Sequence, residues 1–213
     1  MGFAKECWPF VLPFLGLAAL LLATGQPRWS LVTTLLALVI LFFFRIPSRS
    51  DSAPLDAILS PASGKILRLD TLQDPDIGPG DYHRVVIFLS VFNVHVQRAP
   101  LGGTVIVSSY TPGRKLPAFN AQAGEVNEQL LTVIRRSNGE LVGIRQIAGL
   151  LARRVVSYLE VDEKITRGQL MGVIKFGSRV DLMLPSSYPL QVEVGQKLVE
   201  GETIVALNGI ETP

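Results

Sequence analysis

Two nearly continuous apolar stretches occupy the first 45 residues of the chain. No charged residue lies within Cys7–Pro27 or within Trp29–Phe44. The first stretch is long enough to cross a bilayer as a helix, whereas the second would measure only roughly 24 Å against a hydrocarbon core of about 30 Å. The turn-forming run 25–28 (Gly-Gln-Pro-Arg) separates them. The pattern predicts an α-helical membrane hairpin over residues 1–46, either spanning or re-entrant, with both ends on one face.

Aromatic and basic residues flank this hairpin as they flank membrane segments. Trp8, Trp29 and the run 42–44 suit the interface, and the basic residues outside the turn outnumber the one within it: Lys5, Arg45 and Arg49 against Arg28. This bias predicts that the rest of the chain lies at the cytoplasmic face of the cell membrane. A secretory signal peptide is the competing interpretation, but a second apolar stretch follows at once and no convincing cleavage site precedes it.

The pattern after residue 46 is that of a β-rich domain, residues 47–213. A polar Ser/Pro linker over 47–54 is followed by short β-branched runs between Gly and Pro residues, at 57–59, 85–89, 104–107 and 130–134. The pair Asn138-Gly139 predicts a hairpin turn, because both residues tolerate positive φ angles. The only helix we expect in this domain lies around Ile147–Leu159.

A weak internal repeat in the last third of the chain sharpens the fold class. Residues 161–170 resemble residues 194–204, each with a glycine after a tight turn and an apolar residue beyond it. This pattern is typical of barrel-sandwich hybrid folds, such as lipoyl-type domains. The lysine-centred tripeptide of a lipoyl or biotinyl carrier is missing. We therefore expect a mainly β protein with a barrel-sandwich-hybrid-like C-terminal part, preceded by the helical hairpin.

Composition removes several classes of function. Of 213 residues 48% are hydrophobic and 18% are charged, which excludes a disordered chain. The net charge of +2, from 20 basic and 18 acidic residues, is too balanced for a nucleic-acid partner. Cys7 is the single cysteine and His83 and His95 are the only histidines, so neither a disulfide within the chain nor a metal site is expected.

The step Gly177-Ser178 stands between two strand-like runs, where no tight turn is needed. One interpretation is a β-bulge, in which glycine supplies a positive φ angle. The other is chemical: a serine hydroxyl can attack a strained preceding carbonyl, and glycine there removes side-chain obstruction. The resulting ester can break by β-elimination to dehydroalanine, which hydrolyses to a pyruvoyl group. That ketone condenses with an amine and withdraws electrons during decarboxylation.

Four segments carry a resemblance to a known family. Phe176-Gly177-Ser178-Arg179-Val180-Asp181 resembles the self-cleavage site of the short-type phosphatidylserine decarboxylases, including archaetidylserine decarboxylase-like members. The run 88–100 (FLSVFNVHVQRAP) resembles that family's Leu-Ser-Pro-x-Asp-Val-His-Val-Asn-Arg-x-Pro segment. The run 60–66 (SPASGKI) resembles its Ser-Pro-Ala-Asp-Gly-Lys-Val segment, and Asn127-Glu128 resembles part of its Glu-Asn-Glu-Arg stretch. The similarity extends over nearly the whole chain.

The resemblance implies a membrane-associated proenzyme that cleaves itself between Gly177 and Ser178. The products would be a β chain, residues 1–177, and an α chain, residues 178–213, which stay together as a heterodimer; further oligomerisation is left open. Ser178 would become the covalent pyruvoyl cofactor. The reaction implied is conversion of the phospholipid phosphatidylserine to phosphatidylethanolamine and carbon dioxide. The headgroup and the ester or ether backbone of the lipid are left open.

The resemblance gives a role to His95, and side-chain chemistry suggests one for three basic residues. His95 is expected to deliver a proton at the carbanion carbon or to assist Ser178 during cleavage, whereas His83 matches no motif and is interpreted as a surface residue. Arg98, Arg114 and Lys115 are candidates for binding the lipid phosphate, with solvated surface charges as the alternative.

The chain departs from the family pattern at Ser63, where the family usually carries an aspartate. Asp181 and Glu125 are candidate substitutes for that carboxylate. The departure supports an alternative function: a non-catalytic, membrane-tethered hybrid-barrel adaptor that no longer cleaves itself. A Ser178–Lys175 hydrolase is disfavoured, because residues three apart in a strand point to opposite faces.

Overall fold

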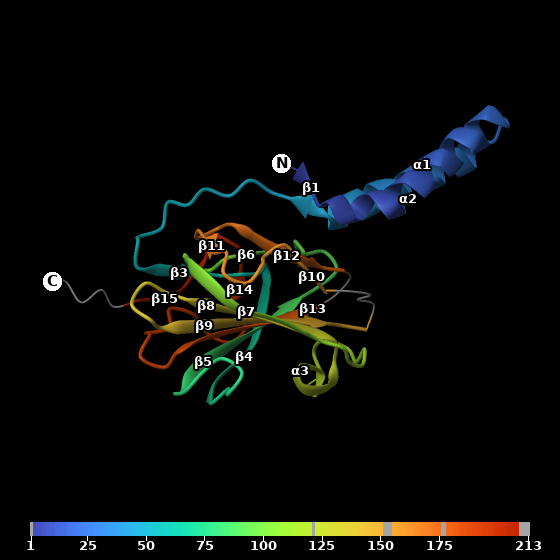
Figure 1. Cartoon of the computed structure of the whole chain (residues 1–213). Coiled ribbons are helices and arrows are strands. Elements are labelled where there is room, and N and C mark those ends of the chain that lie inside the picture. The colour runs from blue at the N-terminus through green and yellow to red at the C-terminus, as the bar shows by residue number, and fades with distance from the viewer. Residues whose placement is uncertain (1, 121, 151–154, 176–177, 209–213) are drawn as a thin grey trace. The chain divides into compact units, whose positions relative to one another are not determined.

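The computed structural model describes residues 2–120, 122–150, 155–175 and 178–208. The chain forms two compact units, residues 1–48 and 49–213, and each is described by itself (Figure 1). The described part is mainly β, with a pair of N-terminal helices, as the sequence predicts.

The first unit is a helical hairpin closed by a small strand pair. A short 3-10 turn, η1 (Lys5–Cys7), leads into α1 (Trp8–Ala23), and α2 (Pro27–Phe43) returns after a turn in which Gly25 has a φ of +75°. At the open end β1 (Gly2–Phe3) pairs with β2 (Arg45–Ile46). The Ser30 hydroxyl donates to the Ala18 carbonyl, 2.8 Å away, which joins the two helices.

One helical stretch in this unit passes the length and hydropathy test for a membrane span. The 19 residues Lys5–Ala23 have a mean hydropathy of 1.8, and Pro27–Phe43 is apolar but shorter. Most of the large apolar side chains of both helices are exposed, including Leu20, Leu22 and Val39. Side chains of this kind need an apolar environment beyond the helix pair itself.

The second unit is built on a curled antiparallel sheet of eight strands in the order β11-β7-β8-β9-β13-β5-β4-β14. Two smaller sheets, β10-β12-β6 and β15-β3, complete it (Figure 1). The bounds are β3 (Ala57–Leu59), β4 (Gly64–Leu72), β5 (Tyr82–Leu89), β6 (Val96–Arg98), β7 (Gly103–Thr111), α3 (Ala123–Val126), β8 (Gln129–Arg135), β9 (Leu141–Ala148), β10 (Val155–Ser157), β11 (Lys164–Ile165), β12 (Leu170–Ile174), β13 (Ser178–Pro185), β14 (Lys197–Leu198) and β15 (Ile204–Leu207).

The two copies of the sequence repeat fold alike and close opposite edges of the large sheet. Positive φ angles fall at matching positions: Asp162 (68°) matches Gly195 (91°), and Gly168 (81°) matches Gly201 (71°). Each copy supplies a two-residue edge strand, β11 against β7 and β14 against β4. The predicted turn at Asn138-Gly139 is also confirmed, since it joins β8 to β9 with Gly139 at a φ of +87°.

The two faces of the large sheet carry different cores, because side chains alternate along each strand. The main core lies on the face that includes Ile144 of β9 and the Val180, Leu182 and Leu184 side chains of β13. Met183 of β13 packs instead into a smaller cluster with Ile77, Tyr82, Leu131 and Val133. Ser178 therefore shares the main-core face with Val180, and Arg179 and Asp181 share the other.

The helix predicted around Ile147–Leu159 is wrong for the described residues of that range. Ile147 and Ala148 end β9, and Val155, Val156 and Ser157 form β10; residues 151–154 lie outside the described part. Pairing explains the difference, because Ile147 lies between Gln129 of β8 and Arg179 of β13 and completes both ladders. β-Branched residues such as Val155 and Val156 are also common in strands.

Candidate active site

Ser178 opens β13, in the middle of the large sheet. It is opposite Leu89 of β5 on one side and Ala148 of β9 on the other. The residue is fully buried, and its Oγ atom has no hydrogen-bond partner in the part of the chain that the structure describes. Gly177, the other half of the predicted cleavage site, lies outside the described residues. A buried hydroxyl without a partner is costly, so it calls for a functional explanation.

His95 lies beside the segment that leads into Ser178. Its backbone oxygen accepts a hydrogen bond of 3.2 Å from the Ile174 amide at the end of β12, four residues before Ser178. Its ring is fully buried, with Nδ1 2.9 Å from the Asn93 backbone oxygen. Because that oxygen can only accept, Nδ1 carries the hydrogen and Nε2 is the basic nitrogen of the neutral ring.

A chain of buried amides continues from His95 into the main-core face. Gln97 donates from Nε2 to the His95 oxygen (2.8 Å), and Gln146 donates from Nε2 to Gln97 Oε1 (2.7 Å). Both glutamines are at most 1% exposed, and Gln146 Oε1 has no partner among the described residues. Because both side-chain amides donate toward His95, the Gln146 Oε1 atom remains as a hydrogen-bond acceptor at the far end of this series. Neither glutamine was singled out in the sequence, because a polar residue inside a β-run reads as an exposed position.

Asn127 and Glu128 brace the strand next to Ser178. The Asn127 side-chain amide donates to the Ala148 oxygen (2.7 Å), and the Ala148 amide donates to the Glu128 oxygen (2.9 Å). Glu128 also accepts a hydrogen bond from the Val155 amide (3.1 Å). This short motif, singled out in the sequence, therefore fixes Ala148, which is the direct neighbour of Ser178 in the sheet.

Ser63, at the position where an aspartate was expected, contacts a buried carboxylate from another segment. Its hydroxyl is hydrogen-bonded to Glu200 Oε2, and the Glu200 amide donates back to Ser63 Oγ at 3.1 Å. Glu200 is fully buried, and Arg49 donates to its Oε1 atom from Nε (2.9 Å) and Nη2 (2.8 Å). Gly64, the next residue after Ser63, begins β4, whose Lys65 pairs with Phe88 of β5.

The two carboxylates proposed from sequence as substitutes lie elsewhere. Asp181 accepts two hydrogen bonds of 2.6 Å from Arg179, and both residues are on the face of β13 opposite to Ser178. Glu125 belongs to α3, on the connection between β7 and β8. Glu200 is the carboxylate that touches Ser63, and the sequence did not single it out, because it stands among other charged residues in the repeat.

The three candidate phosphate-binding residues are not equivalent. Arg98 is half-buried in β6 and donates from Nη1 to the Gly168 oxygen (2.9 Å). Burial lowers the pKa of Arg98, while the nearby Glu200 carboxylate acts in the opposite direction. Arg114 and Lys115 are exposed on the connection between β7 and α3, where the Arg114 backbone bridges to Asn127. These last two are available to a ligand in solution or at a surface.

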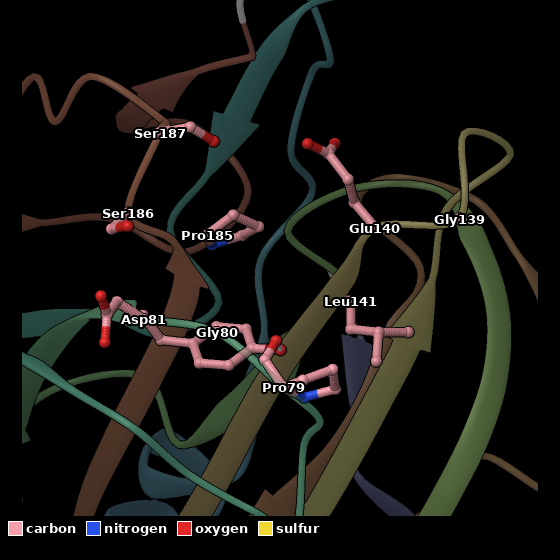
Figure 2. A pocket seen from close by; sticks show the side chains of 10 residues that line it. Pro79, Gly80, Asp81, Gly139, Glu140, Leu141, Pro185, Ser186 and Ser187 are labelled. Atoms are coloured by element: carbon pink, nitrogen blue, oxygen red, sulfur yellow. Dashed lines mark hydrogen bonds between the residues drawn. The ribbon is translucent and has the colours of Figure 1, made fainter.

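A cavity of about 390 Å³ lies at the other end of β13. Figure 2 shows it between Pro79–Tyr82, the turn with Gly139–Leu141, and Pro185–Ser187. Pro185 ends the strand that Ser178 begins, so the strand's length separates the cavity from Ser178. His83 lies toward this end as well, opposite Leu184, with Nδ1 3.2 Å from the Thr71 hydroxyl.

Comparison with known proteins places the whole arrangement in one family. The family model for phosphatidylserine decarboxylase matches residues 36–206, which include Ser63, His95, Asn127 and Ser178. The chain belongs to the phosphatidylserine decarboxylase family. A phosphatidylserine decarboxylase proenzyme of Desulfotalea psychrophila is 41% identical over 197 residues, covering 91% of this chain and 92% of that protein.

Two further relatives agree with this assignment. Phosphatidylserine decarboxylase proenzymes of Ralstonia pickettii and Burkholderia ambifaria are 38% and 39% identical over 203 residues, covering 95% of this chain and 94% of each relative. The resemblance found in the short motifs is thereby confirmed at the level of the family. Its motif residues surround the start of β13: Ser178 itself, His95 beside the strand that precedes it, and Asn127 behind the strand next to it.

Proposed function

We propose that this chain is a phosphatidylserine decarboxylase proenzyme that cleaves itself between Gly177 and Ser178 and then converts phosphatidylserine to phosphatidylethanolamine and carbon dioxide. The single observation that carries the proposal is the fully buried Ser178 hydroxyl, unpartnered among the described residues, at the start of a central strand. Family membership and the proenzyme names of the relatives support it. The non-catalytic adaptor is not favoured.

Self-cleavage needs a serine held against the preceding carbonyl. Ladders on both sides of β13 fix the Ser178 backbone. The Ser178 Oγ atom would attack the carbonyl carbon of Gly177, the bond from that carbon to the Ser178 nitrogen would break, and that nitrogen would receive a proton. The ester would then break by β-elimination, and hydrolysis of the dehydroalanine would release ammonia and leave the pyruvoyl group. We assign the uptake of the hydroxyl proton to His95 Nε2, on the segment whose backbone is hydrogen-bonded to Ile174. The Asn93 oxygen holds the imidazole in the required tautomer.

The residues present fit a pyruvoyl group at position 178. Such a group supplies a ketone that accepts the substrate amine and withdraws electrons as carbon dioxide leaves. The buried setting of Ser178 excludes water from that position, and the buried His95 ring is the group that we assign to hold and return a proton. The exposed Arg114 and Lys115 are the candidates for the lipid phosphate, and Arg98 is the buried one.

The fold explains how two chains would remain together after the cut. The α chain would contribute β13 to the centre of the large sheet, between β5 and β9, and β14 and β15 at the edges against β4 and β3. All of these partner strands belong to the β chain. The ladders and the shared core would hold the two pieces as a heterodimer without a covalent link.

The membrane anchor fits a lipid substrate. The apolar stretch Lys5–Ala23 can cross a membrane by length and composition, and the basic residues that flank the hairpin favour the cytoplasmic face. An enzyme tethered in this way is held in the plane where its substrate headgroups lie, which raises their local concentration.

The experiment is release of carbon dioxide from carboxyl-labelled phosphatidylserine by the detergent-solubilised full chain. The unaltered protein should release it. Ser178→Ala should release none, because no hydroxyl remains to start the cleavage. Full activity of Ser178→Ala would overturn the pyruvoyl assignment.

A further inference from the structure

Exposed apolar side chains gather at the end of the large sheet where Ser178 lies. Phe92 is 77% exposed, Phe119 69%, Leu150 61% and Val91 41%. We call these four residues the site rim. Val91 and Phe92 follow Leu89, and Leu150 follows Ala148; Leu89 and Ala148 are the two residues opposite Ser178. Phe119 contacts the Phe88 ring edge-on, with the centroids 6.3 Å apart.

Basic residues share this end of the sheet. Arg114 and Lys115 are exposed on the same connection that carries Phe119, between Thr111 and Gln129, which pair with each other at the end of β7 and β8. The connection thus presents two cations and an aromatic ring together. Aromatic rings beside lysine and arginine side chains are typical of segments that lie in the membrane interface.

The turns at the opposite end of the sheet differ in the side chains that they expose. Its turns, over residues 73–81, 136–140 and 185–187, expose no large apolar side chain among the described residues. Two carboxylates, Asp81 and Glu140, line the cavity in Figure 2 at this end, and Glu140 is paired with Arg136 at 3.3 Å. The Ser178 end of the sheet is therefore apolar and basic, whereas these turns at the opposite end are polar.

We propose that the site rim, with Arg114 and Lys115, docks the second unit directly on an anionic phospholipid surface. The rim residues enter the headgroup region, and the two cations pair with lipid phosphates. The docked surface brings lipid headgroups to the start of β13.

The charge pattern favours a lipid surface over a protein partner. Phosphatidylserine and its membrane are anionic, which matches the two exposed cations at the Ser178 end. The identity of the substrate rests on the proposed function. The inference adds that the loops carrying the site rim, Arg114 and Lys115 bind the membrane in addition to the N-terminal hairpin. Exposed apolar groups that are flanked by polar residues mark interaction sites.

The test places an environment-sensitive fluorophore at single positions of the full chain in lipid nanodiscs. Cys7→Ser removes the only native cysteine. Phe92→Cys and Phe119→Cys then label the rim, and Ser137→Cys labels the exposed turn at the far end as a matched control. We expect the rim probes to shift to the blue and to be quenched by nitroxide lipids, more strongly when phosphatidylglycerol is added to phosphatidylcholine. The far-end probe should do neither.

Rim probes that behave like the far-end probe would overturn the inference. Blue-shifted rim probes that respond neither to nitroxide lipids nor to added phosphatidylglycerol would also overturn it, and would favour a protein partner. The readout needs no catalysis, so it can be repeated in Ser178→Ala. Docking without decarboxylation by the unaltered chain would reject the proposed function and leave the surface assignment intact.

A kinetic experiment uses the double variant that carries both Phe92→Ser and Phe119→Ser. It should lower the decarboxylation rate about tenfold on phosphatidylserine in vesicles, since burial of the two rings is lost. The rate on a monomeric short-chain phosphatidylserine should be unchanged. An equal loss on both substrates would show that these residues act on the site and not on docking.

Discussion

Glu200 places a carboxylate against Ser63, the position where the family usually carries an aspartate. The carboxylate is fully buried, and it is held by Arg49 on one oxygen and by Ser63 on the other. Arg49 also reaches Glu202, at 3.2 Å, but Glu202 is largely in solvent. The same arginine therefore has one buried and one exposed partner.

This difference predicts unequal effects of removing the two glutamates. Glu200→Ala should lower the free energy of unfolding by about 3 kcal/mol, because a partly buried guanidinium loses its main partner. Glu202→Ala, the matched control, should cost less than about 1 kcal/mol. Urea unfolding of the solubilised full chain, followed by tyrosine fluorescence and circular dichroism, measures both. Equal losses would mean that the Glu200 pair contributes no more than a surface ion pair.

The two histidines make a second matched pair. His95→Ala should lose most of the decarboxylase activity, because Nε2 beside the Ser178 segment is removed. His83→Ala should keep the activity, since His83 is opposite Leu184 at the far end of β13. Rates on phosphatidylserine in mixed micelles test this. Similar losses for both variants would contradict the placement of the site.

At the scale of elements, the pairing of β4 with β5 includes a charged contact across the strands. Asp70 is opposite Arg84 and accepts hydrogen bonds from Arg84 Nε (2.8 Å) and Nη2 (2.7 Å). The hydrogen bond with Arg84 is the main reason that the pKa of Asp70 lies below its ordinary value of 3.8. A carboxylate with a lowered pKa in the folded state stabilises the fold above its unfolded pKa.

Asp70→Asn should therefore change the pH dependence of stability. Above about pH 4 the variant should be less stable than the unaltered chain, because only the latter keeps the charged pair. As the pH falls below the lowered pKa of Asp70, both forms are uncharged at this position and the difference should vanish. Thermal unfolding at several pH values measures it. A constant difference down to the lowest pH would show that the charge of Asp70 does not matter.

Much of this element-level structure could be predicted from sequence, and its failures have a physical cause. The runs 57–59, 85–89, 104–107 and 130–134 all lie in strands, and the repeat correctly marks the two edge strands. The helix expected around Ile147–Leu159 was wrong, because ladder partners distant in sequence decide the conformation there. The pattern of a single sequence reports local propensity, and it carries no information on which distant strands will pair.

The site was predictable only where local motifs mark it. Ser178, His95 and Asn127 stand in recognisable runs, whereas Glu200 and Gln146 become visible only when the fold brings them to Ser63 and Gln97. Both are polar residues in segments where a solvent-facing position is the default expectation. Their burial, at 0% and 1% exposure, is a tertiary property that no local window contains.

For the whole molecule, the proposed cut at Gly177-Ser178 has the largest structural consequence. It would separate the chain into residues 1–177 and 178–213, with the short piece inserted as β13 between β5 and β9. Intact-mass analysis of the full chain, purified from membranes in detergent, tests it most directly. Self-cleavage predicts two masses that part at this bond, with a pyruvoyl group at the start of the short chain. A single uncut chain of 23.2 kDa would contradict it.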